Sequence, residues 1–267
     1  MSTGMTGSSS GVKWTVMMVG FGMLVPASVM GQSRCEFRDV VELSARAQGD
    51  VEIRAGSGLL EVEGSDAVSE VLVTATLCAS EEDWLDELQV TAESMNSGVL
   101  IETEYPRDRD GWGNKYARID LVVTVPSGMA LDIEDSSGSM EVVNVGDVRI
   151  DDSSGEIIVR GAGAVVIDDS SGGIDIRDAT GHVEVSDGSG GLEIRSVDGD
   201  VLLSDGSGGI DVEAVTGSVR IERMGSGGVR IDDVEGDLIV EEGKRSRIKY
   251  SDVRGTLDLP PARRRGN

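Results

Sequence analysis

From Gly138 onward the chain repeats one pattern of positions: a glycine, any residue, an apolar residue, any residue and a second apolar residue. Fourteen successive half-repeats follow it, if Ser246 replaces glycine once and Tyr250 is allowed as apolar. Alternation with a period of two places both apolar residues on one face of a short strand. The glycines supply the turns, where a positive φ or a close backbone approach is needed. They are Gly138, Gly146, Gly155, Gly163, Gly172, Gly181, Gly190, Gly199, Gly208, Gly217, Gly227, Gly236 and Gly255.

One such strand cannot bury its apolar face alone, so the repeats must stack. Two half-repeats make a coil of about 18 residues, with each strand hydrogen-bonded to its equivalent in the next coil. The sequence therefore predicts an all-β fold, a parallel β-solenoid with two short strands per coil. One corner of each coil carries a further apolar residue, which predicts a third apolar column: Val145, Ala162, Ala179, Val197, Val215, Val234 and Val253.

The opposite corner carries the turn Asp135-Ser136-Ser137-Gly138 and its copies, which begin at Asp152, Asp169, Asp187 and Asp205. Strict alternation would point these aspartates inward, where a dry column of like charges is costly. We therefore expect the chain to bend at each aspartate and to turn its carboxylate toward backbone N–H groups, as in an Asx-turn, or toward solvent.

Calcium is the alternative role for Asp152, Asp169, Asp187 and Asp205, because nonapeptide repeats with two-turn coils of about 18 residues bind it. The register differs from that of calcium-binding repeats, since the residue between the two apolar positions varies. Asp108-Arg109-Asp110-Gly111 is a second calcium candidate, but it lacks the distal glutamate of a full calcium loop. We favour metal-free turns and expect no cofactor.

Residues 1–31 have the features of a secretory signal peptide, with Lys13 ahead of an apolar run that is too short for a comfortable membrane span. Arg34 directly before Cys35 argues against a lipoprotein anchor. We expect an exported protein, periplasmic or at the cell surface, with no membrane span in the mature chain. Export implies an oxidising setting, which favours a disulfide between Cys35 and Cys78, the two cysteines of the sequence.

Residues 32–130 are less regular and predict a β-rich N-terminal cap that merges into the solenoid of residues 131–259, with residues 260–267 as a disordered basic tail. A hairpin is expected across Asn96-Ser97-Gly98. The loop from Tyr105 through Trp112 to Tyr116 mixes aromatic, charged and glycine residues, which makes it a candidate recognition loop.

Charge and composition exclude several classes of function. The full chain has a formal charge of −25. Removal of residues 1–31, and with them Lys13, leaves 23 basic against 49 acidic residues, or −26. This charge argues against binding to nucleic acid or anionic membranes. A single histidine, His182, and no nucleophile elbow give hydrolase chemistry little support. A carbohydrate-active β-helix would use paired carboxylates, but these coils leave little room for loops that build a cleft.

Three features together resemble a known family: the strand end Val123-Thr124-Val125-Pro126-Ser127-Gly128, the Ser-Gly repeats after it, and the exported N-terminus. They are similar to the bacterial putative-adhesin domain family of unknown function, related to the head-GIN domains. The resemblance covers roughly residues 37–259. It implies a single-domain β-solenoid outside the bacterial cytoplasmic membrane and gives no catalytic residues.

We therefore expect an exported, non-enzymatic β-solenoid, either an adhesin or an envelope-associated binding or structural protein. Its partner would be an envelope or surface macromolecule. The alternatives are a carbohydrate-active β-helix enzyme acting on envelope polysaccharide and a calcium-dependent repeat protein.

Overall fold

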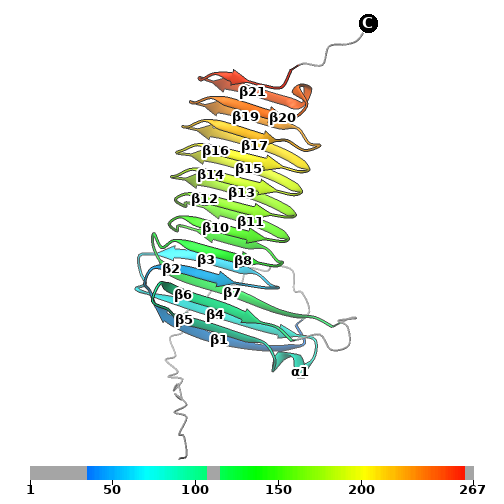
Figure 1. Ribbon diagram of the computed structural model, residues 1–267. Helices are drawn as coiled ribbons and strands as arrows, with labels where there is room; N and C mark the ends of the chain where they lie inside the picture. The colour runs from blue at the N-terminus through cyan, green and yellow to red at the C-terminus, as the bar shows by residue number, and fades with distance from the viewer. Residues whose placement is uncertain (1–34, 107–114, 262–267) are drawn as a thin grey trace, which may run out of the picture. The chain divides into compact units, whose positions relative to one another are not determined.

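The computed structural model describes residues 35–106 and 115–261, which form two β-sheets of eleven strands each, here called sheet A and sheet B (Figure 1). Sheet A holds β1 (Phe37–Arg46), β3 (Leu60–Ser65), β4 (Glu70–Ala79), β7 (Ala117–Pro126), β9 (Met140–Val143), β11 (Gly155–Arg160), β13 (Gly172–Ala179), β15 (Gly190–Val197), β17 (Gly208–Val215), β19 (Val229–Val234) and β21 (Ile248–Val253). Sheet B holds β2 (Asp50–Arg54), β5 (Gln89–Ser94), β6 (Gly98–Glu104), β8 (Leu131–Asp135), β10 (Val148–Asp152), β12 (Val165–Asp169), β14 (Val183–Asp187), β16 (Val201–Asp205), β18 (Val219–Arg223), β20 (Leu238–Glu242) and β22 (Leu257–Asp258). Two short helices are α1 (Glu82–Leu85) and η1 (Arg245–Arg247). The predicted signal peptide lies outside the described residues.

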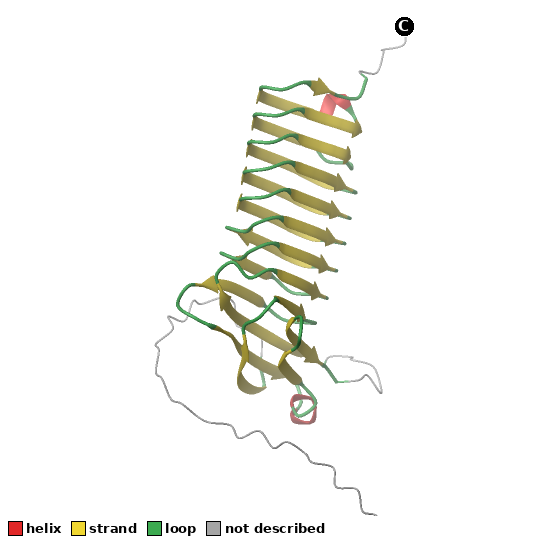
Figure 2. Ribbon diagram, turned by 60° about the vertical axis from the view of Figure 1, so that its left-hand side comes forward, coloured by secondary structure: helices red, strands yellow, loops and turns green. Residues whose placement is uncertain are grey.

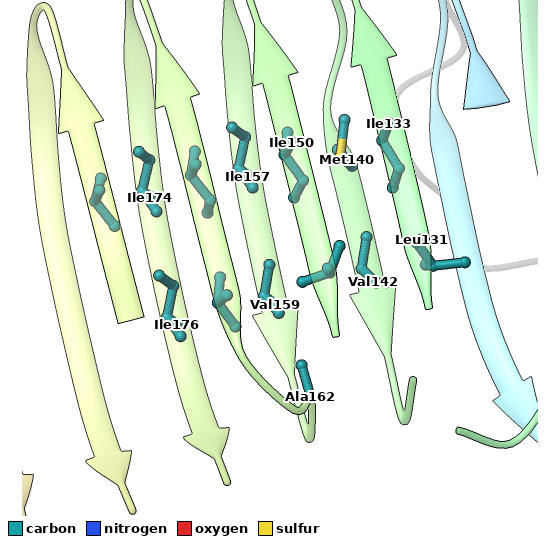
Figure 3. Packing of buried hydrophobic residues seen from close by; sticks show 14 of the residues in the cluster. Leu131, Ile133, Met140, Val142, Ile150, Ile157, Val159, Ala162, Ile174 and Ile176 are labelled. Atoms are coloured by element: carbon teal, nitrogen blue, oxygen red, sulfur yellow. The ribbon is translucent and has the colours of Figure 1, made fainter. Parts of the chain in front are cut away.

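From β8 to β22 the chain alternates between the two sheets, and strands of neighbouring coils pair in parallel (Figure 2). The pairing keeps the register of the repeat, so Ile174 lies beside Leu192 and Ile176 beside Ile194. These apolar residues are buried between the sheets, as Figure 3 shows for the coils around Ile157. The predicted fold class, a parallel β-solenoid with two short strands per coil, is confirmed.

The third apolar column is also confirmed, at the corner where the chain passes from sheet A to sheet B. Its members Val145, Ala162, Ala179, Val197, Val215 and Val234 are buried, and Val253 is partly buried. The residue before each has a positive φ, for example 59° at Ala214 and 58° at Ser196. A side chain disfavours this conformation by about 1 kcal/mol or more. Glycine, asparagine and aspartate adopt it more readily and occupy the other five positions, at Asn144, Gly161, Asp178, Asp233 and Asp252. At Ser196 and Ala214 the packing of the apolar column imposes the turn.

Glycines line the other corner, where the chain passes from sheet B to sheet A. A Cβ on Gly190 would lie 1.4 Å from the carbonyl oxygen of Gly172, and a Cβ on Gly208 would lie 1.4 Å from that of Gly190. Successive coils approach each other here through bare backbone. The repeat therefore needs glycine at this position for close approach of the coils.

The N-terminal region extends both sheets, but not in chain order. β2 and β3 pair in parallel with β8 and β9, so residues 50–65 form the neighbouring coil. β6 and β7 then pair in parallel with the far sides of β2 and β3. β5 forms the predicted hairpin with β6, and β4 and β1 continue sheet A in antiparallel fashion beyond β7. This end therefore mixes solenoid coils with antiparallel edge strands.

At the other end the last coil is less buried than those below it. Tyr250 and Leu257 continue the inward positions of Ile231 and Leu238, yet they are 38% and 46% exposed. No later described strand covers them. Pro260 and Pro261 follow β22, and proline cannot donate to a further strand.

Gly190→Ala should destabilise the solenoid strongly, because its Cβ would clash with the backbone of the coil below. Gly191→Ala is the matched control: it lies one residue later, and a Cβ there meets nothing within 4 Å. We expect the melting temperature to fall by at least about 5 °C for Gly190→Ala and to change by no more than about 2 °C for Gly191→Ala. Equal shifts in thermal melts would contradict the assigned close contact between coils.

Candidate functional site

The repeated aspartates occupy the last position of five sheet B strands, β8, β10, β12, β14 and β16. An Oδ1 atom accepts a hydrogen bond from the backbone N–H two residues later, at 3.1 Å for Asp169, 2.9 Å for Asp187 and 2.8 Å for Asp205. Asp152 makes the same contact with Ser154 at 3.3 Å. The expected Asx-turns are therefore present at these corners.

The expectation that the chain bends at each aspartate, so that the carboxylate leaves the inward face, is wrong. Asp152, Asp169 and Asp187 are each 2% exposed and Asp205 is 0% exposed. The alternation of inward and outward residues continues to the end of each sheet B strand, and the chain bends only after the aspartate. Each aspartate keeps its inward position because the strand does not bend until after it.

Five aspartates consequently stack inside the solenoid, and we call them the aspartate column: Asp135, Asp152, Asp169, Asp187 and Asp205. Each lies directly beside the next one in the neighbouring strand. The second carboxylate oxygen, Oδ2, of Asp135, Asp169, Asp187 and Asp205 is buried and has no hydrogen-bond partner among the described residues. Buried polar atoms without a partner are rare and costly.

Burial, together with the charges of neighbouring aspartates, raises the pKa of the Asp135 and Asp187 carboxyls to about 6. Burial also raises the pKa values of Asp152, Asp169 and Asp205. The backbone N–H groups of the Asx-turns act in the opposite direction, since they stabilise the ionised form. Burial outweighs these hydrogen bonds along the whole column.

Departures from the repeat close both ends of the column. Below Asp135, the corresponding turn in the coil of β2 and β3 begins with Ala55, whose N–H donates to the carbonyl of Glu134 at 2.8 Å. Above Asp205, the strand register shifts by one residue, and the buried Met224 follows Arg223 at the end of β18. The column therefore begins and ends at apolar side chains.

Residues 35–106 and 115–261 contain no group of three or more histidine, cysteine, aspartate or glutamate side chains placed to hold a metal ion. The second calcium candidate, Asp108 to Gly111, lies outside these residues. In the same ranges, neither helix is long and apolar enough to cross a bilayer.

The structure joins Cys35 and Cys78 through a disulfide, with 5.5 Å between their Cα atoms. Cys78 is fully buried in β4, while Cys35 lies just before β1. The bond fastens the start of edge strand β1 to the strand with which it pairs. Its loop spans 43 residues, for which a stabilisation of about 3–4 kcal/mol is typical.

The candidate recognition loop is anchored at both ends by tyrosines with structural contacts. The Tyr105 hydroxyl donates to the carbonyl of Ser57 and accepts from its N–H, both at 2.8 Å. A Cβ on Gly56 would lie 2.3 Å from the Tyr105 ring, so a glycine is needed there. The Tyr116 hydroxyl accepts from the N–H of Glu36 at 3.3 Å. Trp112 lies outside the described residues.

These contacts assign Tyr105 to the packing of the turn Ala55-Gly56-Ser57-Gly58. The sequence held a signal for this role, since that turn is the copy of Asp135-Ser136-Ser137-Gly138 in which alanine replaces aspartate. A departure from the repeat marks a place where another part of the chain packs against it.

The outer face of sheet A carries a groove that the sequence did not predict. We call it the sheet A groove; its lining includes Gly191, Gly209, Gly228, Arg230, Arg247 and Lys249. A Cβ on Gly191 would meet nothing within 4 Å, and one on Gly228 would come no nearer than 3.7 Å to its neighbours. These second glycines of the Gly-Gly pairs are therefore not required by packing. Their missing side chains leave the groove open.

Charged side chains flank the groove. Glu193 is shared by Arg177, at 3.0 Å, and by Arg195. Arg230 pairs with Asp211 at 3.3 Å. Arg247 donates to the carbonyl of Ser226, and among the described residues neither Arg247 nor Lys249 forms an ion pair with an acidic side chain. Both cations are therefore available to a ligand at the groove.

Comparisons with solved structures find bacterial proteins named putative adhesins. One, from Parabacteroides distasonis, has 14% sequence identity and a TM-score of 0.48, over 83% of this chain and 97% of that one. Another, from Parabacteroides merdae, has 11% identity and a TM-score of 0.44, over 83% and 96%.

A P. distasonis structure named as a putative lipid binding protein has 15% identity and a TM-score of 0.42, over 82% of this chain and 94% of that one. No protein-family model matches the chain, and the comparison with curated proteins gives no match. Structural neighbours named putative adhesins were expected from the resemblance of the sequence.

Tyr105→Phe should lower stability, because it removes the acceptor of the Ser57 N–H. The Ser57 carbonyl loses the Tyr105 hydroxyl but keeps its bond from the N–H of Ile119 at 2.8 Å. Loss of the partner of this partly buried N–H should cost about 1 kcal/mol, which corresponds to roughly 3 °C in melting temperature for a chain of this size. Tyr116→Phe is the control, since it removes a single longer bond, and should shift the melting temperature by less than about 2 °C. If the two variants melt alike, the structural role of Tyr105 is wrong.

Proposed function

We propose that this chain is an exported, non-enzymatic protein that binds a macromolecule of the cell envelope or cell surface through the outer face of sheet A. The sheet A groove is the observation that carries the proposal. Its second glycines are needed neither for packing nor for a turn, so contact with another molecule is a reason for leaving this stretch of sheet uncovered.

The distribution of acidic residues supports binding over catalysis. Carboxylate catalysis on a polysaccharide needs two accessible carboxyl groups that face each other across a bound sugar. The aspartates of the column are buried, and Asp175, Glu193 and Asp211 on the outer face of sheet A are held in ion pairs. A hollow beside Arg54 is lined by Glu134, Asp151 and the first column member, Asp135, but its lining has no aromatic side chain on which a sugar ring could stack.

The groove is preferred over the loop between Tyr105 and Tyr116 as the contact surface. Both tyrosines are engaged in contacts within the chain, so neither is free to change partner without loss of those bonds. The groove, by contrast, lies on paired strands whose backbone is fixed by the sheet. A rigid surface binds with a smaller loss of conformational entropy.

The disulfide between Cys35 and Cys78 supports export, because such bonds persist in oxidising compartments. Together with the signal-peptide features of residues 1–31, it favours the periplasm or the cell surface as the place where the partner is met.

Capture of envelope fractions by the purified mature protein tests the function. We expect Gly191→Trp to reduce capture at least about tenfold, because the new ring would occupy the groove, a loss of about 1.4 kcal/mol or more. Ser186→Trp is the matched control, an outward-facing position on β14 of sheet B, and should bind as the parent does.

Equal capture by the parent and Gly191→Trp would contradict the groove as the contact surface. Loss of capture in Trp112→Ala, with Gly191→Trp unaffected, would place the contact in the loop instead. Release of sugars from the envelope fraction by the purified protein would contradict the non-enzymatic assignment.

A further inference from the structure

The aspartate column poses a problem that the Asx-turns do not solve. The Asx-turns satisfy one carboxylate oxygen of Asp169, Asp187 and Asp205, yet the Oδ2 atoms of these residues and of Asp135 remain buried and unpartnered. The members of the column are between 0% and 8% exposed and occupy equivalent positions in adjacent strands. Strands in a sheet are about 4.8 Å apart, so five ionised carboxylates would repel one another strongly in a poorly screened interior.

Few charged groups near the column could offset this repulsion. Arg223 at the end of β18 is the cation that acts on Asp205, and it is exposed. Asp151 and Asp168, the outward neighbours on β10 and β12, add negative charge, and Tyr105 lies near Asp135. The inward positions of sheet A opposite the column carry apolar residues, such as Ile157 and Ile174. Nothing in these surroundings balances several negative charges.

Protonation removes both difficulties at once. A protonated carboxyl is uncharged, and its O–H can donate to an acceptor such as the unpartnered Oδ2 of an adjacent aspartate after a small rotation of the side chain. Two carboxyl groups that share one site titrate as a pair, and one of them keeps its proton to a higher pH. The column extends this arrangement from a pair to a stack of five.

We propose that the aspartate column binds protons when the solenoid folds, so that protonated and ionised aspartates neighbour each other along the stack and acid stabilises the fold. The proposal concerns the interior of the solenoid and is independent of the contact surface on sheet A. It makes the stability of the protein responsive to the acidity of its surroundings.

The direction of the pH dependence follows from the pKa values. Unfolded aspartates ionise near pH 4, whereas the folded carboxyls of Asp135 and Asp187 have pKa values of about 6. Between these values the folded state holds more protons than the unfolded state does. The contribution of the column to stability is therefore fully present below about pH 4, and it is lost as the pH rises through about 6.

Thermal melts of the mature protein at about pH 5.5 and about pH 7.5 test the proposal. We expect the parent to melt higher at the lower pH, by roughly 5 °C or more. Asp169→Asn/Asp187→Asn should raise the melting temperature at the higher pH and reduce the difference between the two conditions at least about twofold. An asparagine amide is neutral and can donate where a carboxylate cannot.

Asp151→Asn/Asp168→Asn is the matched control, because it removes the same formal charge from outward positions next to the column. It should keep most of the pH dependence of the parent. A parent that melts no higher in acid would overturn the proposal, as would a control that flattens the pH dependence as much as the column variant does. A column variant that melts lower than the parent at the higher pH would also overturn it.

A measurement on the parent keeps the test decisive if the column variant does not fold. Carboxyl carbon NMR of protein labelled at aspartate should show at least two carboxyls that titrate above about pH 5. A spectrum in which every aspartate titrates near its ordinary value would overturn the proposal.

Melting in the presence of chelator or calcium tests whether the column binds a metal ion instead of protons. At about pH 7.5 we expect chelator and millimolar calcium to change the melting temperature of the parent only slightly, since diffuse screening gives small gains. A rise of roughly 10 °C with calcium, absent in Asp169→Asn/Asp187→Asn, would show that the column holds a metal ion and would overturn proton binding.

Discussion

The in-register stacking of identical positions is the constraint on which the rest of this structure depends. Every residue of a repeat coil lies beside its equivalent in the next coil, so whatever one position does is repeated along the stack. Apolar positions gain from this, because Ile174, Leu192 and Ile210 form a continuous core. Glycine positions become obligatory, because Gly172, Gly190 and Gly208 touch through their backbones. An inward acidic position becomes a problem for the same reason.

At outward positions the same stacking allows ion pairs to form between neighbouring coils. Arg177 on sheet A lies between Asp175 and Glu193 and bonds to both, at 2.8 and 3.0 Å. Arg195 similarly bonds to Glu193 and Glu213. Each exposed pair contributes little alone. The register places like charges side by side, Asp175 beside Glu193 and Arg177 beside Arg195, which destabilises a sheet. The diagonal ion pairs between neighbouring coils offset this repulsion.

The repeat could be predicted from sequence because its signals are local. A glycine and two alternating apolar residues identify a strand and its inward face, and equal spacing identifies its neighbour in the stack. The order of the N-terminal coils could not be predicted this way. Residues 98–126 lie beyond residues 50–65 in the stack, and the pairing between these distant segments leaves no periodic signal in the chain. The position of the sheet A groove was missed for a related reason, since Gly190 and Gly191 look alike in the sequence and differ only in what surrounds them.

The error over the turn aspartates shows where such reasoning fails. We expected a bend at each aspartate because burying a charge is costly, but a neutral acid can be buried in its place. A carboxyl group that keeps its proton costs far less to bury than a carboxylate does. Ala55 and Met224 show that the fold also accepts apolar residues at the ends of the column. Five coils nevertheless have aspartate at this position. An aspartate supplies two things there that an apolar side chain cannot, an Asx-turn and a charge that depends on pH.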